Sequence, residues 1–560
     1  MTRTPSGYLA LSGLLLFGLL ALLPAGTGPT STDPVAHSAI LADGGAALPS
    51  APGELSATAE ELASARPLGN RWPELRGDAR AGLLQTEIQR MVGGSGEWAV
   101  LAVSLESGER LVDLNASNSM APASNQKLLT SAAALEWLGP DFRFPTYLLV
   151  RGPVRDGVLD GDLILFGTGD PTLGLRNPGA PTGAYAHFIE ALRAEGIHEI
   201  RGDIIGDGSF FSGDPRRPSW NPDDLNDWFA APVSALSFNE NVVTLRVRPG
   251  ERAGAPPRIL TQPAGADLPI INDGMTVASR PSPTLLLVRD DPDEPIEIRG
   301  QIHTGGGDVW RSLTVSDPPA FAASILRGTL EGQGIQVGGI ARSVLEHEGL
   351  GSAAPARNGS SPARTLAVHR SPPLPDLLDT LNKRSHNLYG ELLLFTLGRL
   401  EGGDGTFEGG ARALTRYLTE VVGVAEEEVH VVDGSGLSRE NRSTPEALVA
   451  TMERMERTPH GELFWASLPE AGNARELNRM HRSAAAGNLR AKTGTIHRTS
   501  ALSGVVRTVT GEPVLFSIIV NNVPSPWSAK RIEDRIGIAL SDFDRPLPAP
   551  APALTPAGVR

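Results

Sequence analysis

A serine and a lysine stand three residues apart in the segment Ser124-Asn125-Gln126-Lys127. In a helix, residues i and i+3 lie on one face, so the two side chains are expected to be within reach of each other. A serine at a helix N-terminus suits nucleophilic attack, because the positive end of the helix dipole stabilises a developing oxyanion. The lysine acts as a base only where burial or a second cation lowers its pKa. Taken alone, the pair is also typical of a helix-capping serine followed by a surface lysine.

Two further segments carry side chains that suit chemistry. Lys492-Thr493-Gly494-Thr495 ends a β-type run and combines a cation, a hydroxyl group and a glycine that lets a ligand approach the strand closely. Ser385-His386-Asn387 lies between two helical patterns and offers a hydroxyl group and a carboxamide that both donates and accepts. Without context, a turn or a helix cap is the simpler interpretation of this last segment.

Lysine is rare in this chain. Of the 50 basic residues, only Lys127, Lys383, Lys492 and Lys530 are lysines. The base composition of a GC-rich genome explains such a bias in general, but arginine stays charged and cannot replace lysine where a neutral amine is required. Three of the lysines lie in or beside the segments above, which favours a chemical role for them.

The composition is that of a globular protein without thiol chemistry. The chain has 560 residues, of which 40% are apolar and 20% charged, so it is long enough for several cores. Its net charge of −14 argues against a nucleic-acid partner. It has no cysteine, which excludes disulfides, thiol catalysis and cysteine-ligated metals. The histidines show no metal-ligand spacing, and no P-loop or GxSxG elbow occurs, so we predict neither a metal nor another cofactor.

Both ends of the chain are predicted to lie outside the folded part. A basic residue, an apolar run over residues 9–23 and the small residues 24–26 are typical of a secretory signal, so residues 1–26 are interpreted as a signal peptide. The run is short for a membrane span, and we expect membrane contact only if it is not cleaved. Residues 27–76 are interpreted as a low-complexity tether and residues 544–560 as a disordered tail.

The folded part is predicted to be an α/β unit with a long insertion. Residues 77–140 combine a helical pattern, a hairpin around Glu106-Ser107-Gly108 and the helix that carries Ser124. Residues 141–365 change to short β-type runs with Gly, Pro and Asp turns. Residues 366–543 return to helices, followed by a strand, a hairpin and a final helix. The two ends together therefore make an α/β unit that a largely β insertion interrupts.

The three motifs occur in the order SxxK, SxN, KTG, which is the active-serine signature of penicillin-binding proteins and β-lactamases. The segment between Ser124 and Ser385 is too long for the compact β-lactamases, and this spacing resembles that of the low-molecular-mass class C penicillin-binding proteins. The resemblance covers about residues 80–543. Its further motifs are Gly169-Asp170-Pro171-Thr172-Leu173, Ala231-Pro232-Val233-Ser234-Ala235-Leu236 with Asn239 and Asn241, Asp433-Gly434-Ser435-Gly436-Leu437-Ser438-Arg439, Asn441, Thr444-Pro445 and Ala501-Leu502-Ser503-Gly504.

The resemblance implies catalytic or substrate-binding roles for ten of these residues. The implied catalytic residues are Ser124 as nucleophile, Lys127 as its base, Ser385 as proton relay, Asn387 on the substrate amide, and Lys492 beside the terminal carboxylate. The implied substrate-binding residues are Thr493, Gly494, Thr495, Asp170 and Arg439. Backbone N–H groups of Ser124 and Thr495 would form the oxyanion hole, while Asp170 and Arg439 would contact the side chain of a stem-peptide residue.

The family's fold and activity follow as expectations. The fold is a penicillin-binding/transpeptidase-like domain, an antiparallel sheet flanked by helices, with one or two nested domains inserted after the SxxK helix. The activity is that of a serine-type D-alanyl-D-alanine carboxypeptidase, which acts on peptidoglycan stem peptides through an acyl-Ser124 intermediate and is covalently inhibited by β-lactams. We expect the charge of Lys492 to keep Lys127 neutral. The expected location is the periplasm or cell envelope of a bacterium.

Two residues depart from the family pattern. His386 stands where the family usually has aspartate, at a position that normally points away from the substrate, so we expect the core triad to survive. His497 follows Lys-Thr-Gly-Thr-Ile where a small or neutral polar residue is usual, which leaves the substrate preference open.

Three alternative functions stay open at this point. A D,D-endopeptidase uses the same catalytic set and differs in the breadth of its pocket. A β-lactamase needs a dedicated carboxylate base for deacylation, and none can be placed in the sequence. A non-catalytic peptidoglycan-binding or penicillin-sensing protein would not need all of these serines, lysines and Asn387.

Overall fold

The structure is a computed structural model that describes residues 79–174, 183–278, 284–344 and 363–546. The segments predicted as a signal peptide and a tether lie outside these residues. Within the described ranges, no helix is both long enough and apolar enough to cross a membrane.

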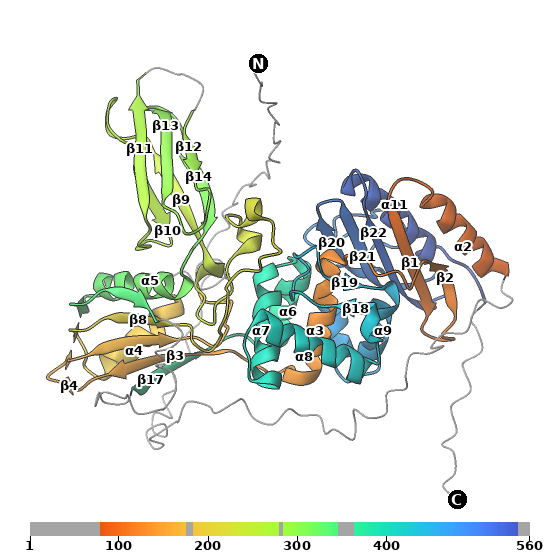
Figure 1. Cartoon of the computed structure of the whole chain (residues 1–560), viewed down its shortest axis with the longest axis horizontal. Coiled ribbons are helices and arrows are strands. Elements are labelled where there is room, and N and C mark those ends of the chain that lie inside the picture. Colours follow the sequence, from red (N-terminus) through yellow and green to blue (C-terminus); the bar gives the residue numbers. More distant parts are fainter. Residues whose placement is uncertain (1–78, 175–182, 279–283, 345–362, 547–560) are drawn as a thin grey trace, which may run out of the picture. The chain divides into compact units, whose positions relative to one another are not determined.

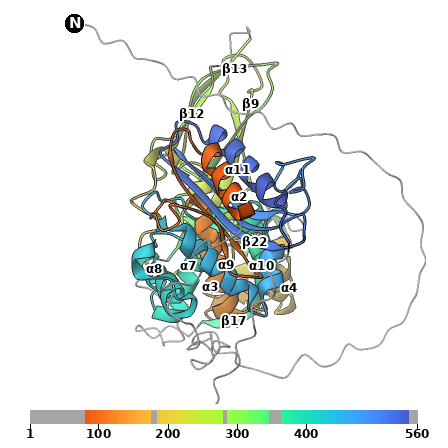
Figure 2. The same cartoon turned by 90° about the vertical axis from the view of Figure 1, so that its right-hand side faces the viewer.

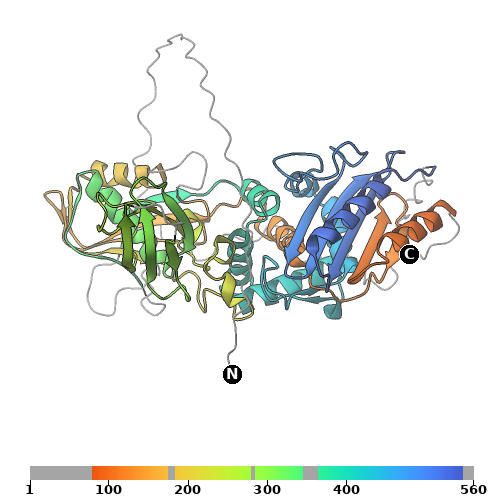
Figure 3. The same cartoon turned by 90° about the horizontal axis from the view of Figure 1, so that it is seen from above.

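Both ends of the chain contribute strands to one antiparallel sheet. Its strands are β1 (Glu97–Ser104), β2 (Arg110–Leu114), β20 (Arg490–Ile496), β21 (Thr499–Arg507) and β22 (Pro513–Asn521), in the order β2-β1-β22-β21-β20. Strand β1 pairs with β22 along its whole length, from Glu97 opposite Asn521 to Ser104 opposite Val514. Figure 3 shows the blue C-terminal strands beside the orange N-terminal ones. The predicted hairpins β1–β2 and β21–β22 are thus joined through their inner strands.

Helices cover both faces of this sheet. On one face lie α2 (Ala79–Met91) and α11 (Pro526–Ser541), and on the other lie α3 (Gln126–Leu138) and α9 (Pro445–Glu456) (Figure 2). Successive residues of a strand point to opposite faces, so Trp98, Val100 and Ala102 enter the core beneath α2 and α11. Their neighbours Ala99, Leu101 and Val103 enter the core shared with α3 and α9. This double coverage explains why β1 is apolar almost throughout, without the alternation of a half-exposed strand.

The remaining elements of this domain lie between α3 and β20 in sequence or lead into α3. They are η1 (Ala123–Asn125), α6 (Leu374–Lys383), α7 (Asn387–Gly402), α8 (Phe407–Arg416), η6 (Tyr417–Val422), η7 (Glu426–Glu428), β18 (Val429–His430), β19 (Arg442–Ser443) and α10 (Gly461–Ala466). Helix α7 is buried over most of its length and packs against α3, α6 and α8. It is the helix that begins at the third residue of the SxN motif.

The segment between α3 and α6 forms the predicted β-rich insertion. One part contains β3 (Pro145–Arg151), β4 (Val154–Arg155), β5 (Val158–Leu159), β6 (Asp162–Phe166), β7 (Glu199–Ile200), β8 (Ile204–Asp207), β15 (Gln336–Val337), β16 (Ala341–Ser343) and β17 (Arg364–Arg370), with η2 (Gly183–Tyr185), α4 (Ala186–Ala194) and α5 (Pro318–Gly332). Its larger sheet has the order β16-β8-β6-β3-β17 and its smaller one β15-β7-β5-β4. Strands β3 and β17 pair with each other, so the chain enters and leaves the insertion at neighbouring strands.

Two three-stranded sheets make up the other part of the insertion (Figure 1). They contain β9 (Val242–Arg248), β10 (Arg258–Gln262), β11 (Ile270–Val277), β12 (Leu286–Val288), β13 (Ile296–His303) and β14 (Val309–Thr314), in the orders β10-β9-β14 and β11-β13-β12. The turns η3 (Pro222–Asp224), η4 (Trp228–Ala230) and η5 (Asn239–Asn241) precede them. The exact domain boundaries stay predictions.

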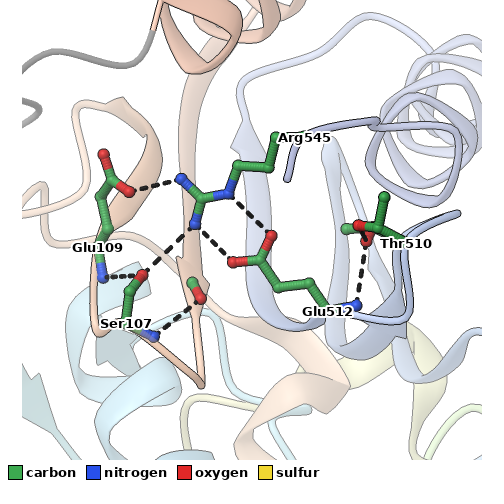
Figure 4. A network of polar contacts seen from close by, with 7 residues as sticks. Ser107, Glu109, Thr510, Glu512 and Arg545 are labelled. Atoms are coloured by element: carbon green, nitrogen blue, oxygen red, sulfur yellow. Dashed lines mark hydrogen bonds and ion pairs between the residues drawn. The ribbon is translucent and has the colours of Figure 1, made fainter. Parts of the chain in front are cut away.

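A buried arginine anchors the chain after α11. Arg545 falls in the segment predicted as a disordered tail, yet its side chain is only 3% exposed. Its guanidinium donates to Glu512 at 2.5 and 2.9 Å and to Glu109 at 2.5 Å (Figure 4). These partners come from the β21–β22 and β1–β2 turns, so Arg545 ties the C-terminal segment to both hairpins. Residues 547–560 of the predicted tail lie outside the described residues.

Candidate active site

The serine and the lysine of the SxxK motif meet as their spacing predicts. Ser124 lies in η1, and Lys127 lies in the first turn of α3, which follows directly. The Nζ atom of Lys127 is 2.9 Å from Ser124 Oγ and donates to Asn387 Oδ1 at 2.7 Å and to the Ser435 carbonyl at 2.7 Å. Lys127 is fully buried, whereas Ser124 is partly exposed. The serine hydroxyl group is therefore accessible from outside the protein, whereas the lysine amine contacts it from the interior.

Close backbone approaches hold Ser124 in place. Its neighbour Ala123 has a positive φ of 48°, a conformation that costs a non-glycine residue energy. A Cβ atom at Gly436 would lie 1.8 Å from the carbonyl oxygen of Ala123, so only glycine fits there. A Cβ atom at Gly494 would lie 3.1 Å from Ser124 N. The glycine of the KTG motif thus lets strand β20 pass directly beside the serine.

The SxN and KTG motifs also meet. Lys492 is fully buried, and its Nζ atom donates to Ser385 Oγ at 2.9 Å and to the Thr493 carbonyl at 2.8 Å. Thr495 is exposed, and its hydroxyl group donates to the Gly494 carbonyl at 2.8 Å. Ser385 has a positive φ of 53° and precedes α7 by two residues. The five predicted catalytic residues therefore form two lysine-centred groups. Lys127 contacts Ser124 and Asn387, whereas Lys492 contacts Ser385. The two groups are linked because Ser385 and Asn387 belong to the same three-residue motif.

Burial changes the proton affinity of both lysines. It lowers the pKa of Lys127 to about 7, although the charges of Glu391 and Asp433 act in the opposite direction. The pKa of Lys492 is lowered well below its ordinary value, first by burial and then by the charge of Lys127. Burial, rather than the charge of Lys492 on which the sequence prediction relied, is the main cause for Lys127. The low dielectric surroundings disfavour the ammonium form of either amine.

Two buried carboxylates, Glu391 and Asp433, lie behind Lys127 and were given no role from the sequence, although Asp433 belongs to one of the family motifs. Glu391 accepts from the backbone N–H groups of Gly434 at 2.8 Å and Ser435 at 3.0 Å. Asp433 accepts from several donors of the same loop, including Gly436 N at 2.7 Å. Burial raises the pKa of Glu391 to about 8. The available signal was a glutamate within the apolar run of α7, four residues after Asn387 and hence on the same helical face.

Among the hydrogen bonds and ion pairs of the described residues, none joins Asp170, Arg439 or His497 to the two lysine-centred groups. Asp170 is buried, accepts from Thr172 N at 2.8 Å and lies 3.5 Å from His369 Nε2. Burial raises its pKa to about 6. Arg439 is exposed and follows the loop that contains Asp433, and His497 is exposed in the turn between β20 and β21. Among the contacts of the described residues, none joins Asp170 or Arg439 to Ser124.

The described residues offer little to hold a metal ion. Within residues 79–174, 183–278, 284–344 and 363–546, no group of three or more histidine, aspartate or glutamate side chains is arranged to bind one.

The sequence matches a known peptidase family. Residues 85–541 match the D-Ala-D-Ala carboxypeptidase 3 (S13) family. A D-alanyl-D-alanine carboxypeptidase from Actinomadura sp. strain R39 is 32% identical over 492 residues, which cover 85% of this chain and 86% of the relative. The D-alanyl-D-alanine carboxypeptidase DacB of Haemophilus influenzae is 26% identical over 75% of this chain and 84% of its own.

Solved structures show the same fold. The crystal structure of penicillin-binding protein 4 from Haemophilus influenzae superposes with a TM-score of 0.66 at 25% identity, covering 80% of this chain and 98% of that one. A structure of that protein complexed with a novel β-lactam gives a TM-score of 0.62 at 24% identity, covering 82% and 99%. The likeness confirms the predicted fold class, a penicillin-binding domain with β-rich insertions.

Proposed function

This chain belongs to the D-Ala-D-Ala carboxypeptidase 3 (S13) family, and from that premise we propose that its reaction proceeds through an acyl intermediate on Ser124. As a member, it is a hydrolase, a serine-type D-alanyl-D-alanine carboxypeptidase. The observation that carries the proposal is the 2.9 Å contact between Ser124 Oγ and the fully buried Nζ of Lys127. A serine hydroxyl needs an adjacent general base, and burial lowers the pKa of this amine so that it can serve as one.

The acylation step uses the first lysine-centred group. Neutral Lys127 takes the proton of Ser124 Oγ while this oxygen attacks the carbonyl carbon of the D-Ala-D-Ala bond. The tetrahedral oxyanion accepts hydrogen bonds from the backbone N–H groups of Ser124 and Thr495, which the close approach at Gly494 supports. The C–N bond then breaks, the leaving nitrogen takes up a proton, and D-alanine departs with its amino group restored.

The second lysine-centred group, Lys492 with Ser385, acts on the departing D-alanine, and hydrolysis of the acyl-enzyme follows. The proton that Lys127 took from Ser124 is passed through Ser385, which is hydrogen-bonded to Lys492, to the leaving nitrogen, so Lys127 becomes neutral again. Lys492 and Thr493 bind the carboxylate of the terminal D-alanine, and Asn387 orients the substrate amide. Water then attacks the acyl carbonyl and gives up a proton to Lys127. As the bond between the carbonyl carbon and Ser124 Oγ breaks, Lys127 returns this proton to Oγ, and the shortened peptide leaves.

The remaining predicted residues belong to the same proposal. Asp170 and Arg439 contact the side chain of a stem-peptide residue. The proposed carboxylate site at Lys492 and Thr493 also fits a β-lactam, because penicillin presents a carboxylate beside a strained amide. The solved complex of penicillin-binding protein 4 with a β-lactam supports β-lactam binding by this chain. We propose that the enzyme acts in the bacterial cell envelope, and more finely in the periplasm; its carboxypeptidase relatives support the envelope location.

The proposal is tested by release of D-alanine from a stem pentapeptide. We expect Ser124→Ala to abolish release, with Ser541→Ala as the control because this serine lies in α11, remote from the motifs. Both proteins should show the same thermal unfolding. Release of D-alanine by folded Ser124→Ala protein would refute the assignment.

A further inference from the structure

A glutamate of the insertion makes a buried contact with the SxN motif. The side chain of Glu240 is 5% exposed and that of His386 is 1% exposed, and His386 Nε2 lies 3.1 Å from Glu240 Oε2. The other carboxylate oxygen of Glu240 lies 3.3 Å from the guanidinium of Arg384. A carboxylate is buried at a cost that paired and hydrogen-bonded groups must offset. Glu240 therefore engages both residues that flank Ser385.

The backbone on both sides of this pair is held in an unfavourable conformation. Asn239, Glu240 and Asn241 have positive φ values of 52°, 56° and 56°, and Ser385 has one of 53°. Asparagine tolerates this conformation, but for Glu240 and Ser385 it costs about 1–2 kcal/mol each, so it persists only where the surroundings fix it. In η5 the two asparagines do so. Asn239 N donates to the Leu173 carbonyl at 2.7 Å, and Asn241 Nδ2 donates to the Pro232 carbonyl at 2.9 Å.

A second contact of the insertion orients the reactive amide. Asn387 Nδ2 donates to the carbonyl oxygen of Phe229 at 2.7 Å. Because the amide nitrogen is engaged there, the amide oxygen points to Lys127 Nζ, which donates to it at 2.7 Å. The ring of Trp228 lies beside that of His386, with their centroids 5.4 Å apart. The insertion thus contacts the SxN motif at its second and third residues.

From this geometry we infer that Glu240 is a positioning residue, which acts through His386 and Arg384 to hold Ser385 and Asn387 in their reactive arrangement. It does not touch the reacting atoms. The pair also explains the unusual His386, because an aspartate at that position would face the carboxylate of Glu240 and repel it. The inference rests on the proposed function, since it presumes that Ser385 and Asn387 take part in catalysis.

The test is a double-mutant cycle with Glu240→Gln, His386→Asn and the double variant, and Asp203→Asn as the control. Asp203 pairs with Arg342 within the insertion, away from the motif. The measurements are kcat and KM for D-alanine release and the rate constant of acylation by a fluorescent penicillin. We expect each single variant to lose about 5- to 100-fold in kcat and in acylation, with a KM changed by less than about twofold. We expect the double variant to lose no more than the worse single variant, and the control to be unchanged.

Losses that multiply in the double variant, or an acylation rate that Glu240→Gln leaves unchanged, would overturn the inference. If Glu240→Gln does not fold, Arg384→Gln decides the matter, because this arginine side chain is 46% exposed and its loss leaves the core intact. An unchanged acylation rate there counts against the inference, and a loss without change in KM supports it. Failure of the proposed function is distinguishable, because then the unmodified protein carries no penicillin label on Ser124.

Discussion

The pH dependence of acylation follows from the surroundings of Lys127. Burial lowers its pKa to about 7, from 10.5 for an ordinary lysine. The proposed base must be neutral, and a lysine is neutral above its pKa, so acylation should become faster as the pH rises. The rate constant should level off once most of the amine is neutral.

The magnitude follows from the fraction of neutral amine. With a pKa of about 7, this fraction rises from about a tenth at pH ~6 to about nine-tenths at pH ~8. We therefore expect an increase of about tenfold across this interval and almost none beyond pH ~9. A lysine with the ordinary pKa of 10.5 would give about a hundredfold increase over the same interval and a continued rise above it.

The assay is stopped-flow or quenched acylation by a fluorescent penicillin at concentrations far below saturation. The carboxylate of penicillin stays ionised over this range, so the profile reports on the free enzyme. Thermal unfolding at each pH controls for loss of structure. A tenfold rise per pH unit that continues through pH ~9 would refute the reasoning, as would a profile that falls as the pH increases.

Two further predictions concern packing and stability. Gly494→Ala places a methyl group 3.1 Å from Ser124 N, and we expect acylation to slow by about 10- to 100-fold, measured with the same penicillin. Gly82→Ala is the control, because an added methyl group meets nothing within 4 Å there, and an unchanged rate in Gly494→Ala would contradict the account. Arg545→Ala leaves Glu512, which is 0% exposed, without its main cation, so we expect the free energy of unfolding to fall by about 3 kcal/mol in denaturant titrations. An unchanged free energy of unfolding would show that the contacts of Arg545 with Glu512 and Glu109 do not stabilise the fold. As a control, the acylation rate of the folded variant at low temperature should match that of the unmodified protein.

The sequence predicted the local elements of the catalytic domain closely. The helix predicted to carry Ser124 corresponds to η1 and α3, and the hairpin and final helix predicted near the end of residues 366–543 are β21–β22 and α11. Spacing of three residues correctly placed Lys127 beside Ser124, because this contact is local to one helical turn. Helices, strands and contacts within one helical turn could thus be predicted from the sequence alone.

Contacts between distant segments were not predictable in this way. The contacts of Glu240 with His386 and of Phe229 with Asn387 join residues whose proximity depends on how the insertion folds back. The pKa of Lys127 depends on its burial, which a serine–lysine pair in a sequence does not reveal. The sequence therefore identified the groups to which we assign the chemistry, but not what positions and tunes them.

The central claim is that Ser124 carries the acyl group. The most direct test is to react the purified enzyme with a fluorescent penicillin, digest it and identify the labelled peptide by mass spectrometry. We predict a single labelled peptide that contains Ser124, with the added mass of one penicillin on that residue. A label on another residue, or no label on correctly folded protein, would contradict the account.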